Sequence, residues 1–330
     1  MRALIASNGH GLLPFAWRLR REEVDTEVLV FKDKYEAAWE GMPIEKIVRG
    51  KDKSKHTLKL LAEMANDGDM VVLTDSSRGL KIFASAKDVF PKLPTQGEGK
   101  GAFALGAWFN GESFVLEHLL LNDWGLWPGG LGPNVLGGMV LVNRSTVLHE
   151  QLKPLEDQLK SANFKGLISA QVLVAPTGQF TLGQVEFGWP GLHSEAFLSD
   201  ISSLNGLMSQ DHDASLLCGY VVVLPVTMPP YPFQGRLNGD DRIIGGLNSE
   251  DTKSIFFHDF KTNGHSEILS AGLDGYLCVV RGSGNNLTMA RQRALAIAAK
   301  IQVPEKQVRL DVGAKADFVL GMLEEGGVLH

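Results

Sequence analysis

The sequence predicts an α/β protein whose later parts are α+β, and three observations predict it. Residues 2–31 alternate in the β–loop–α–β order that opens a doubly wound sheet, with glycine in the first turn. Asn110-Gly111 lies between two apolar runs, which is the strongest short signal for a β-hairpin. Residues 213–330 have the texture of a small α+β module, in which short strands surround one long helix.

The opening unit consists of a strand over 2–6, a helix over 12–21 and a second strand over 27–31. Its first turn is formed by Ser7, Asn8, Gly9, His10 and Gly11. Such a turn presents backbone N–H groups and a helix N-terminus to a phosphate, but it lacks the GxGxxG pattern. Phosphate binding and an ordinary tight turn therefore both remain open.

Residues 33–84 begin with a stretch for which little regular structure is predicted. Residues 33–56 are charged and irregular and indicate a connector, and 58–65 predict a helix. Met70–Leu73 predicts a strand, which a turn joins to a hairpin partner at Lys81–Ala84.

The central segment predicts paired strands around a glycine-rich loop. The apolar runs 102–109 and 113–121 flank Asn110-Gly111, and 128–142 is dense in glycine. A helix is expected over 146–162 with a break at Pro154. Strands are expected over 166–174 and 179–187, around a second turn.

The last third predicts strands near 254–260 and 276–281 and a helix over Met289–Lys300 with Thr288 as its N-cap. Cys218 and Cys278 lie in apolar runs, so we expect buried thiols and neither a disulfide framework nor a zinc site.

Composition excludes some classes of function. The net charge is −6 and no cluster of Lys and Arg stands out, which argues against nonspecific nucleic-acid binding. No window reaches eighteen apolar residues and the N-terminus has no long apolar stretch, so we expect neither a membrane span nor a signal peptide. The sequence predicts a cytoplasmic protein whose partners are small molecules.

Several segments, taken in order, resemble phosphoribosylamine–glycine ligase. Residues 5–20, IASNGHGLLPFAWRLR, look like that family's first βα unit, and Trp108–Glu112 is similar to its FLDGEE turn. Gly132–Met139 is similar to its GPNTGGMG loop, and 164–187 resembles the strand pair that ends in its VIEFN motif. Further similar segments follow in the last third, among them 309–313, RLDVG.

The resemblance implies an ATP-grasp fold with a truncated N-terminal open α/β domain, a reduced lid and a small C-terminal α+β module. The expected boundaries are 1–50 for the N-terminal domain, 51–104 for the lid, 105–212 for the main domain and 213–330 for the C-terminal module. The implied chemistry joins a small amine or amino acid, such as glycine, to a carboxylate or activated acceptor. ATP and Mg²⁺ are the implied cofactors.

The resemblance also implies roles for single residues. Glu186 and Glu195 are expected to be catalytic, and Glu186 is expected to hold the metal. The residues expected to bind substrate or phosphate are Asn8, Gly9, His10, Gly11, Gly132, Pro133, Asn134, Gly137, Gly138, Met139 and His193. The residues expected to bind nucleotide are Thr74, Arg78, Lys81 and Glu112.

The sequence departs from the family at positions that bear on ATP. Thr74 stands where the family has a lid lysine, Gly106 and Ala107 stand at the acidic hinge, and Gly188 replaces the motif's asparagine. A second function therefore stays open, in which a scaffold that no longer hydrolyses ATP transfers an amino acid onto an activated nucleotide or base, or binds a small molecule. A noncatalytic interaction protein is the third alternative.

Overall fold

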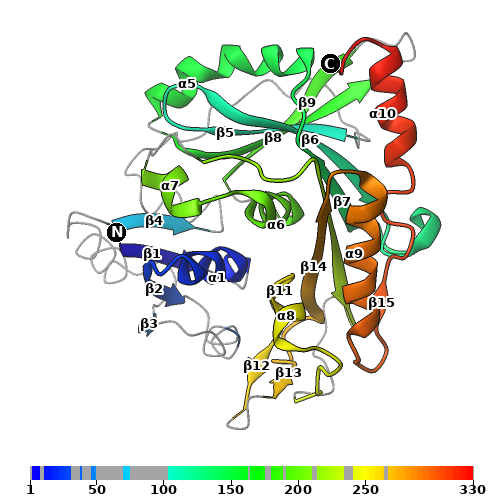
Figure 1. The fold of residues 1–330 in the computed structure, drawn as a ribbon. Coiled ribbons are helices and arrows are strands. Elements are labelled where there is room, and N and C mark those ends of the chain that lie inside the picture. The colour runs from blue at the N-terminus through cyan, green and yellow to red at the C-terminus, as the bar shows by residue number, and fades with distance from the viewer. Residues whose placement is uncertain are drawn as a thin grey trace.

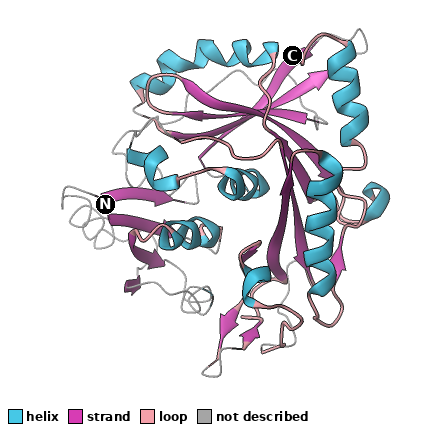
Figure 2. Cartoon of the chain, in the orientation of Figure 1, coloured by secondary structure: helices cyan, strands magenta, loops and turns pink. Residues whose placement is uncertain are grey.

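The computed structural model describes residues 2–7, 11–30, 38, 46–49, 70–74, 103–162, 164–174, 180–188, 191–209, 214–233, 241–263 and 267–329. Within these residues the chain folds as an α/β unit at the N-terminus beside a large antiparallel sheet with helices packed against it (Figures 1 and 2). No helix in the described ranges is long and apolar enough to cross a membrane.

The N-terminal unit is a parallel sheet in the order β3-β2-β1-β4. Its strands are β1 (Arg2–Ser7), β2 (Asp25–Val30), β3 (Lys46–Arg49) and β4 (Met70–Thr74). Helix α1 (Leu13–Arg21) connects β1 to β2 and buries Leu13, Phe15 and Leu19. The expected β–loop–α–β opening is confirmed.

Two expectations for the N-terminal third are wrong. The strand Met70–Leu73 was expected to belong to the lid at 51–104, but β4 pairs in parallel with β1, with Ala3 opposite Val71. Residues 33–56 were expected to be a connector, but β3 within them pairs in parallel with β2. Backbone pairing between segments far apart in sequence decided both, so the N-terminal sheet continues beyond residue 50. The expected hairpin partner at Lys81–Ala84 lies outside the described residues.

The large sheet has the order β11-β14-β10-β7-β6-β5-β8-β9, with β15 also paired to β10. Its strands are β5 (Phe103–Phe109), β6 (Phe114–Trp124), β7 (Leu136–Val142), β8 (Gly166–Val174), β9 (Phe180–Gly188), β10 (Tyr220–Thr227), β11 (Ile255–Phe257), β14 (Tyr276–Gly284) and β15 (Gln307–Val308). A separate ribbon pairs β12 (Lys261–Thr262) with β13 (Ile268–Leu269). The sheet runs across residue 212, so the expected division there separates strands of one sheet.

The Asn110-Gly111 hairpin between β5 and β6 is confirmed. The Asn110 side chain accepts hydrogen bonds from the backbone N–H groups of Glu112 at 2.8 Å and Ser113 at 2.9 Å. Gly111 has φ of 102°, a conformation that glycine adopts without strain. The turn thus fixes the register of the two central strands.

The remaining helices are η2 (Pro128–Gly130), η3 (Val147–Leu155), α5 (Glu156–Ser161), α6 (Gly191–Asp200), α7 (Leu204–Ser209), α8 (Ser249–Thr252), α9 (Leu287–Lys300) and α10 (Ala316–Glu325). The expected helix over 146–162 is present as η3 followed by α5. The N-cap of α9 is Asn286, whose side chain accepts from the Met289 N–H, and not Thr288 as expected.

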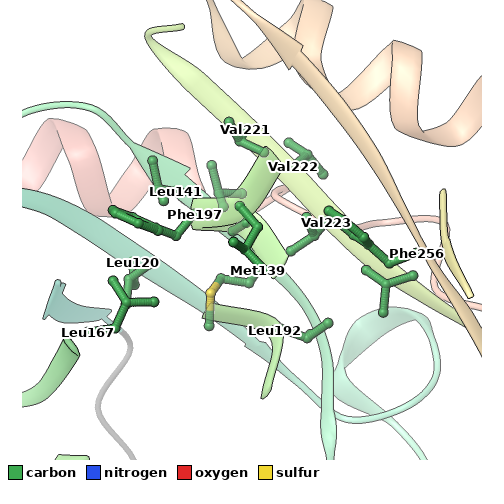
Figure 3. Close-up of a cluster of buried hydrophobic side chains, with 14 of the residues drawn as sticks. Leu120, Met139, Leu141, Leu167, Leu192, Phe197, Val221, Val222, Val223 and Phe256 are labelled. Atoms are coloured by element: carbon green, nitrogen blue, oxygen red, sulfur yellow. The ribbon is translucent and has the colours of Figure 1, made fainter. Parts of the chain in front are cut away.

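Helix α6 occupies the centre of the molecule. It contacts β7, β10 and β14 of the large sheet and α1 of the N-terminal unit. Every residue from Leu192 to Asp200 is buried, so this helix has no solvent face. Figure 3 shows Leu192 and Phe197 of α6 among apolar side chains of the sheet, including Met139 and Val223. A helix buried all round must find partners for its polar side chains.

Candidate functional site

A row of residues crosses four strands on one face of the large sheet. The pairing places Glu186 of β9 opposite Ser169 of β8, Ser169 opposite Gly106 of β5, and Gly106 opposite His118 of β6. Side chains directly opposite one another share a face of the sheet. Three strand spacings of about 4.8 Å therefore separate the ends of the row by roughly 14 Å.

The inner end of the row is closed by two histidines. The imidazole of His118 lies over Gly106, where a Cβ atom would come within 2.2 Å of His118 Nε2. His193 from the first turn of α6 meets the same ring, with the two Nε2 atoms 2.8 Å apart. His118 is 0% exposed and His193 is 2% exposed. Glycine at position 106 is therefore required by the close approach of this ring.

The hydrogen bonds fix the tautomers of the pair. His118 Nδ1 lies 2.7 Å from the Leu116 carbonyl, which can only accept, so Nδ1 carries the proton and Nε2 accepts. His193 Nε2 must then be the donor, which leaves its Nδ1 as a buried acceptor without a partner. Burial lowers the pKa of His118 to about 4 and lowers the pKa of His193 well below its usual value. Both rings are neutral at pH 7.

A third histidine, His149, connects η3 to the strands that carry Gly106 and His118. His149 Nδ1 accepts from the backbone N–H of Thr146 at 3.0 Å, which completes a capping box at the start of η3. Its Nε2 donates to the carbonyls of Gly106 and His118, at 3.3 and 3.2 Å. These two hydrogen bonds join η3 to the backbone of β5 at Gly106 and of β6 at His118.

The strand face beside the pair is also filled. Trp108 of β5 stacks on Phe197 of α6, with ring centroids 6.2 Å apart and planes at 10°. Phe197 also lies against His118, at 5.7 Å between centroids. Phe109 is buried and packs against Phe114 and Phe164. Side chains of the protein therefore cover β5 at Gly106 and Trp108.

The outer end of the row is open. Glu186 is exposed on the edge strand β9, and the surrounding protein still raises the pKa of its carboxyl through partial desolvation. A Cβ atom added at Gly188, which ends β9, or at Gly191, which begins α6, would have no atom of the described residues within 4 Å of it. An exposed carboxylate on an edge strand can accept a ligand without rearrangement of the core.

Glu195 is held in a different place. Its Oε1 accepts a hydrogen bond from Nε2 of His258, which follows β11 at the other edge of the sheet. Both side chains are almost fully buried, and Tyr276 of β14 packs edge-on against the His258 ring at 5.0 Å. Glu195 is therefore buried and paired with His258, whereas Glu186 is exposed on β9.

The expected binding loop Gly132–Met139 is exposed in its first half and buried in its second half. Gly132 and Asn134 are exposed and Pro133 is partly exposed, whereas Gly137, Gly138 and Met139 are buried at the start of β7. A Cβ atom at Gly137 would lie 2.2 Å from the Gly125 carbonyl oxygen. Strands β6, β5 and β8 separate this loop from Glu186.

Packing around a buried arginine explains the glycines of this loop. Arg309 donates to the carbonyls of Trp124 at 2.6 Å and Gly125 at 3.0 Å, and its Nε lies 2.8 Å from the Asp311 carboxylate. A Cβ atom at Gly138 would lie 2.5 Å from Val312. The close approach of residues 309–313 therefore needs small residues in β7.

Three of the other expected residues lie in elements apart from β9. Glu112 is exposed at the β5–β6 hairpin, Thr74 ends β4 in the N-terminal sheet, and Gly11 is exposed before α1. Asn8, Gly9, His10, Arg78 and Lys81 lie outside the described residues.

Sequence reasoning missed both buried pairs, His118–His193 and Glu195–His258. Along the sequence, His118 and His258 each resemble an isolated structural histidine. The available signal is the spacing of His193 and Glu195 on one helix, where positions i and i+2 project about 200° apart and so reach different partners.

The donor set fits a cation that keeps water and phosphate ligands. Among the described residues, no three His, Cys, Asp or Glu side chains gather as a metal cage. Mg²⁺ in nucleotide sites is bound by one or two carboxylates together with substrate phosphates and water. A single exposed Glu186 meets that requirement, whereas buried Glu195 does not.

Comparison with known proteins identifies the fold. No protein-family model and no curated protein matches the sequence. Phosphoribosylamine–glycine ligase from Thermotoga maritima is similar in structure, with a TM-score of 0.52 and 14% identity, over 94% of this chain and 100% of that chain. L-amino acid ligase from Bacillus licheniformis has a TM-score of 0.53 and 11% identity, over 92% and 98% of the two chains.

A third solved structure is the phosphoribosylaminoimidazole carboxylase ATPase subunit from Aquifex aeolicus. It has a TM-score of 0.51 and 10% identity, over 90% of this chain and 99% of that chain. The chain therefore has the ATP-grasp fold, as the resemblance implied. At these identities the likeness concerns the fold, and function must be argued from the site.

Proposed function

We propose that this protein is an ATP-grasp enzyme of the carbon–nitrogen ligase type, which joins a small amine or amino acid to a carboxylate or activated acceptor. The observation that carries the proposal is Glu186, an exposed carboxylate with a raised pKa on the edge strand β9 of an ATP-grasp sheet. Two of the solved structures with this fold are named as ligases, of phosphoribosylamine with glycine and of L-amino acids, and a third is named as an ATPase subunit.

Glu186 is the residue that would hold Mg²⁺ against the phosphates of ATP. The metal would neutralise phosphate charge and so favour transfer to the acceptor carboxylate. The chain's own contribution is to fix this carboxylate on a strand whose partner β8 is itself paired to β5. Asn8 to Gly11 remain candidates for phosphate binding, and Thr74, Arg78, Lys81 and Glu112 for nucleotide binding.

A second function is favoured by a separate observation. Gly106 and Trp108 lie at the strand that would border the nucleotide, and His118, His193 and Phe197 cover that strand. A scaffold in which protein fills this place would act without ATP, transferring an amino acid onto an acceptor that is already activated, or binding a small molecule.

Calorimetry with ATP and Mg²⁺ distinguishes the two. For a ligase, we expect micromolar affinity that falls at least tenfold in Glu186→Ala, because the metal loses its protein carboxylate. Gln184→Ala is the matched control, since Gln184 is exposed on the same face of β9 and carries no charge. The absence of binding at millimolar ATP, or equal affinity in both variants, would reject the ligase and leave the ATP-independent function.

A further inference from the structure

The last helix of the chain, α10, has apolar side chains on two faces. Its inner face buries Ala316, Val319, Leu320 and Leu323. On its outer face Phe318 is 70% exposed and Met322 is 46% exposed. A Cβ atom added at Gly321 would have no neighbour among the described residues within 4 Å. A surface helix usually presents polar side chains to water, so the outer face of α10 has the character of an interaction surface.

A third exposed apolar residue lies beside the C-terminal end of this helix. The Val147 N–H donates to the Val328 carbonyl at 3.3 Å, and Val147 is 44% exposed. Figure 1 shows α10 on the side of the molecule away from the N-terminal sheet. A partner that docks on α10 would therefore leave that sheet free.

The outer face also carries charges at the spacing of a coiled-coil seam. Lys315, Phe318, Met322 and Glu325 are separated by three, four and three residues, which is the a/d spacing of a heptad. Lys315 is the N-cap of α10 and already has helical backbone angles, with φ of −91° and ψ of −9°. These four residues form the α10 seam, which is basic at one end, apolar in the middle and acidic at the other end.

We propose that the α10 seam binds the same seam of a second copy of this chain, with the two helices antiparallel. A two-fold axis opposite residue 320 brings Phe318 against Met322 of the partner subunit. The same axis brings Lys315 against Glu325 of the partner subunit, at both ends of the seam. A parallel pair would instead place Lys315 against Lys315 of the partner subunit, and like charges repel. The charge pattern therefore fits a second copy in the antiparallel direction.

The size of the seam sets the strength of this contact. A stable interface buries about 800 Å² on each partner, and one helix of ten residues with two large apolar side chains provides less. We therefore expect a weak dimer, with a Kd on the order of 100 µM. The inference does not rest on the proposed function, because none of the four seam residues has a role in it.

Sedimentation equilibrium of the full chain, without ATP or Mg²⁺, tests the dimer at protein concentrations up to about 1 mM. Phe318→Asp places a charge against Met322 of the partner subunit, and we expect dimerisation at least roughly tenfold weaker. An acidic residue is compatible with the first turn of a helix, so α10 should remain folded. Phe233→Asp is the matched control, because Phe233 is 68% exposed in the turn after β10 and undergoes the same change. We expect it to dimerise like wild type.

Reversing the charges tests the antiparallel direction. Glu325→Lys and Lys315→Glu each place like charges together at both ends of the seam, and we expect each to weaken dimerisation roughly threefold or more. The double variant with both substitutions restores opposite charges, so its affinity should return close to that of wild type.

Thermal unfolding of each variant checks the fold, because the Lys315 charge also acts on the buried carboxylate of Asp123. If Lys315→Glu unfolds early, the comparison of Phe318→Asp with Phe233→Asp decides the question. The proposal is overturned if the wild-type chain stays monomeric at about 1 mM, or if the two aspartate variants dimerise equally. A folded double variant that dimerises no better than the single reversals overturns the antiparallel pairing.

Discussion

Glu186 and Glu195 were both expected to be catalytic, yet the fold gives them opposite environments. Glu186 is exposed on edge strand β9, whereas Glu195 is 3% exposed on a helix with no solvent face and is paired with His258. An edge carboxylate can exchange water for a ligand, while a buried one must be paired to be tolerated. The position of a carboxylate in the tertiary structure, and not its place along the sequence, therefore decides whether it can bind a ligand.

Replacing each carboxylate in turn gives the largest expected difference between the two environments. Glu195→Ala removes the buried carboxylate that pairs with His258, and we expect it to lower the free energy of unfolding by about 3–5 kcal/mol. Glu186→Ala removes an exposed side chain, and we expect a change within about 0.5 kcal/mol. Urea denaturation of both variants measures the difference. Equal losses of stability would show that the two glutamates are not in contrasting environments.

The next largest effect tests the closed end of the row. Gly106→Ala places a Cβ atom 2.2 Å from His118 Nε2, so the histidine pair must move. We expect a loss of about 1–3 kcal/mol in the free energy of unfolding. Gly321→Ala is the matched control, because Gly321 lies within α10 with open space around it. Removing glycine from a helix interior should stabilise the protein by about 0.5–1 kcal/mol.

Chemical denaturation of the two alanine variants measures both the expected loss and the expected gain in the free energy of unfolding. A Gly106→Ala protein as stable as wild type would mean that His118 does not lie over β5, and the face assigned as closed would then be open to a nucleotide.

The last prediction concerns pH. The pKa of His118 is lowered to about 4 by burial, whereas the unfolded chain has a histidine pKa of about 6.5. Between these values the unfolded state binds a proton that the folded state does not, so stability falls as pH falls from 6.5 toward 4. We expect His118 alone to account for a loss of about 2 kcal/mol between pH 7.5 and pH 5. His193 shifts in the same direction.

Urea denaturation at the two pH values checks this expectation. His118→Gln has no imidazole at this position, so its loss of stability between pH 7.5 and pH 5 should be smaller than that of wild type. An unchanged pH dependence in this variant would show that the His118 proton is not linked to folding.

Local sequence signals predicted much of the fold. The Asn110-Gly111 turn, the helix over 12–21 and the strands over 166–174 and 179–187 depend on contacts within a few residues, and the structure has all of them. Element ends were less well defined, since Asn286 and Thr288 both belong to residue types that form good N-caps.

The sequence by itself determined the β–α–β opening, the central hairpin, the order of the segments that resemble an ATP-grasp ligase, and the presence of acidic residues after β8. Turn residues and hydrophobic periodicity specify these features, because both act over short distances along the chain. Only the tertiary structure decided that β4 joins β1, that α6 is buried on all sides, and that His118 meets His193 while Glu195 meets His258. The physical reason is that a parallel strand pair or a buried polar contact is stabilised by groups distant in sequence, which no local pattern specifies.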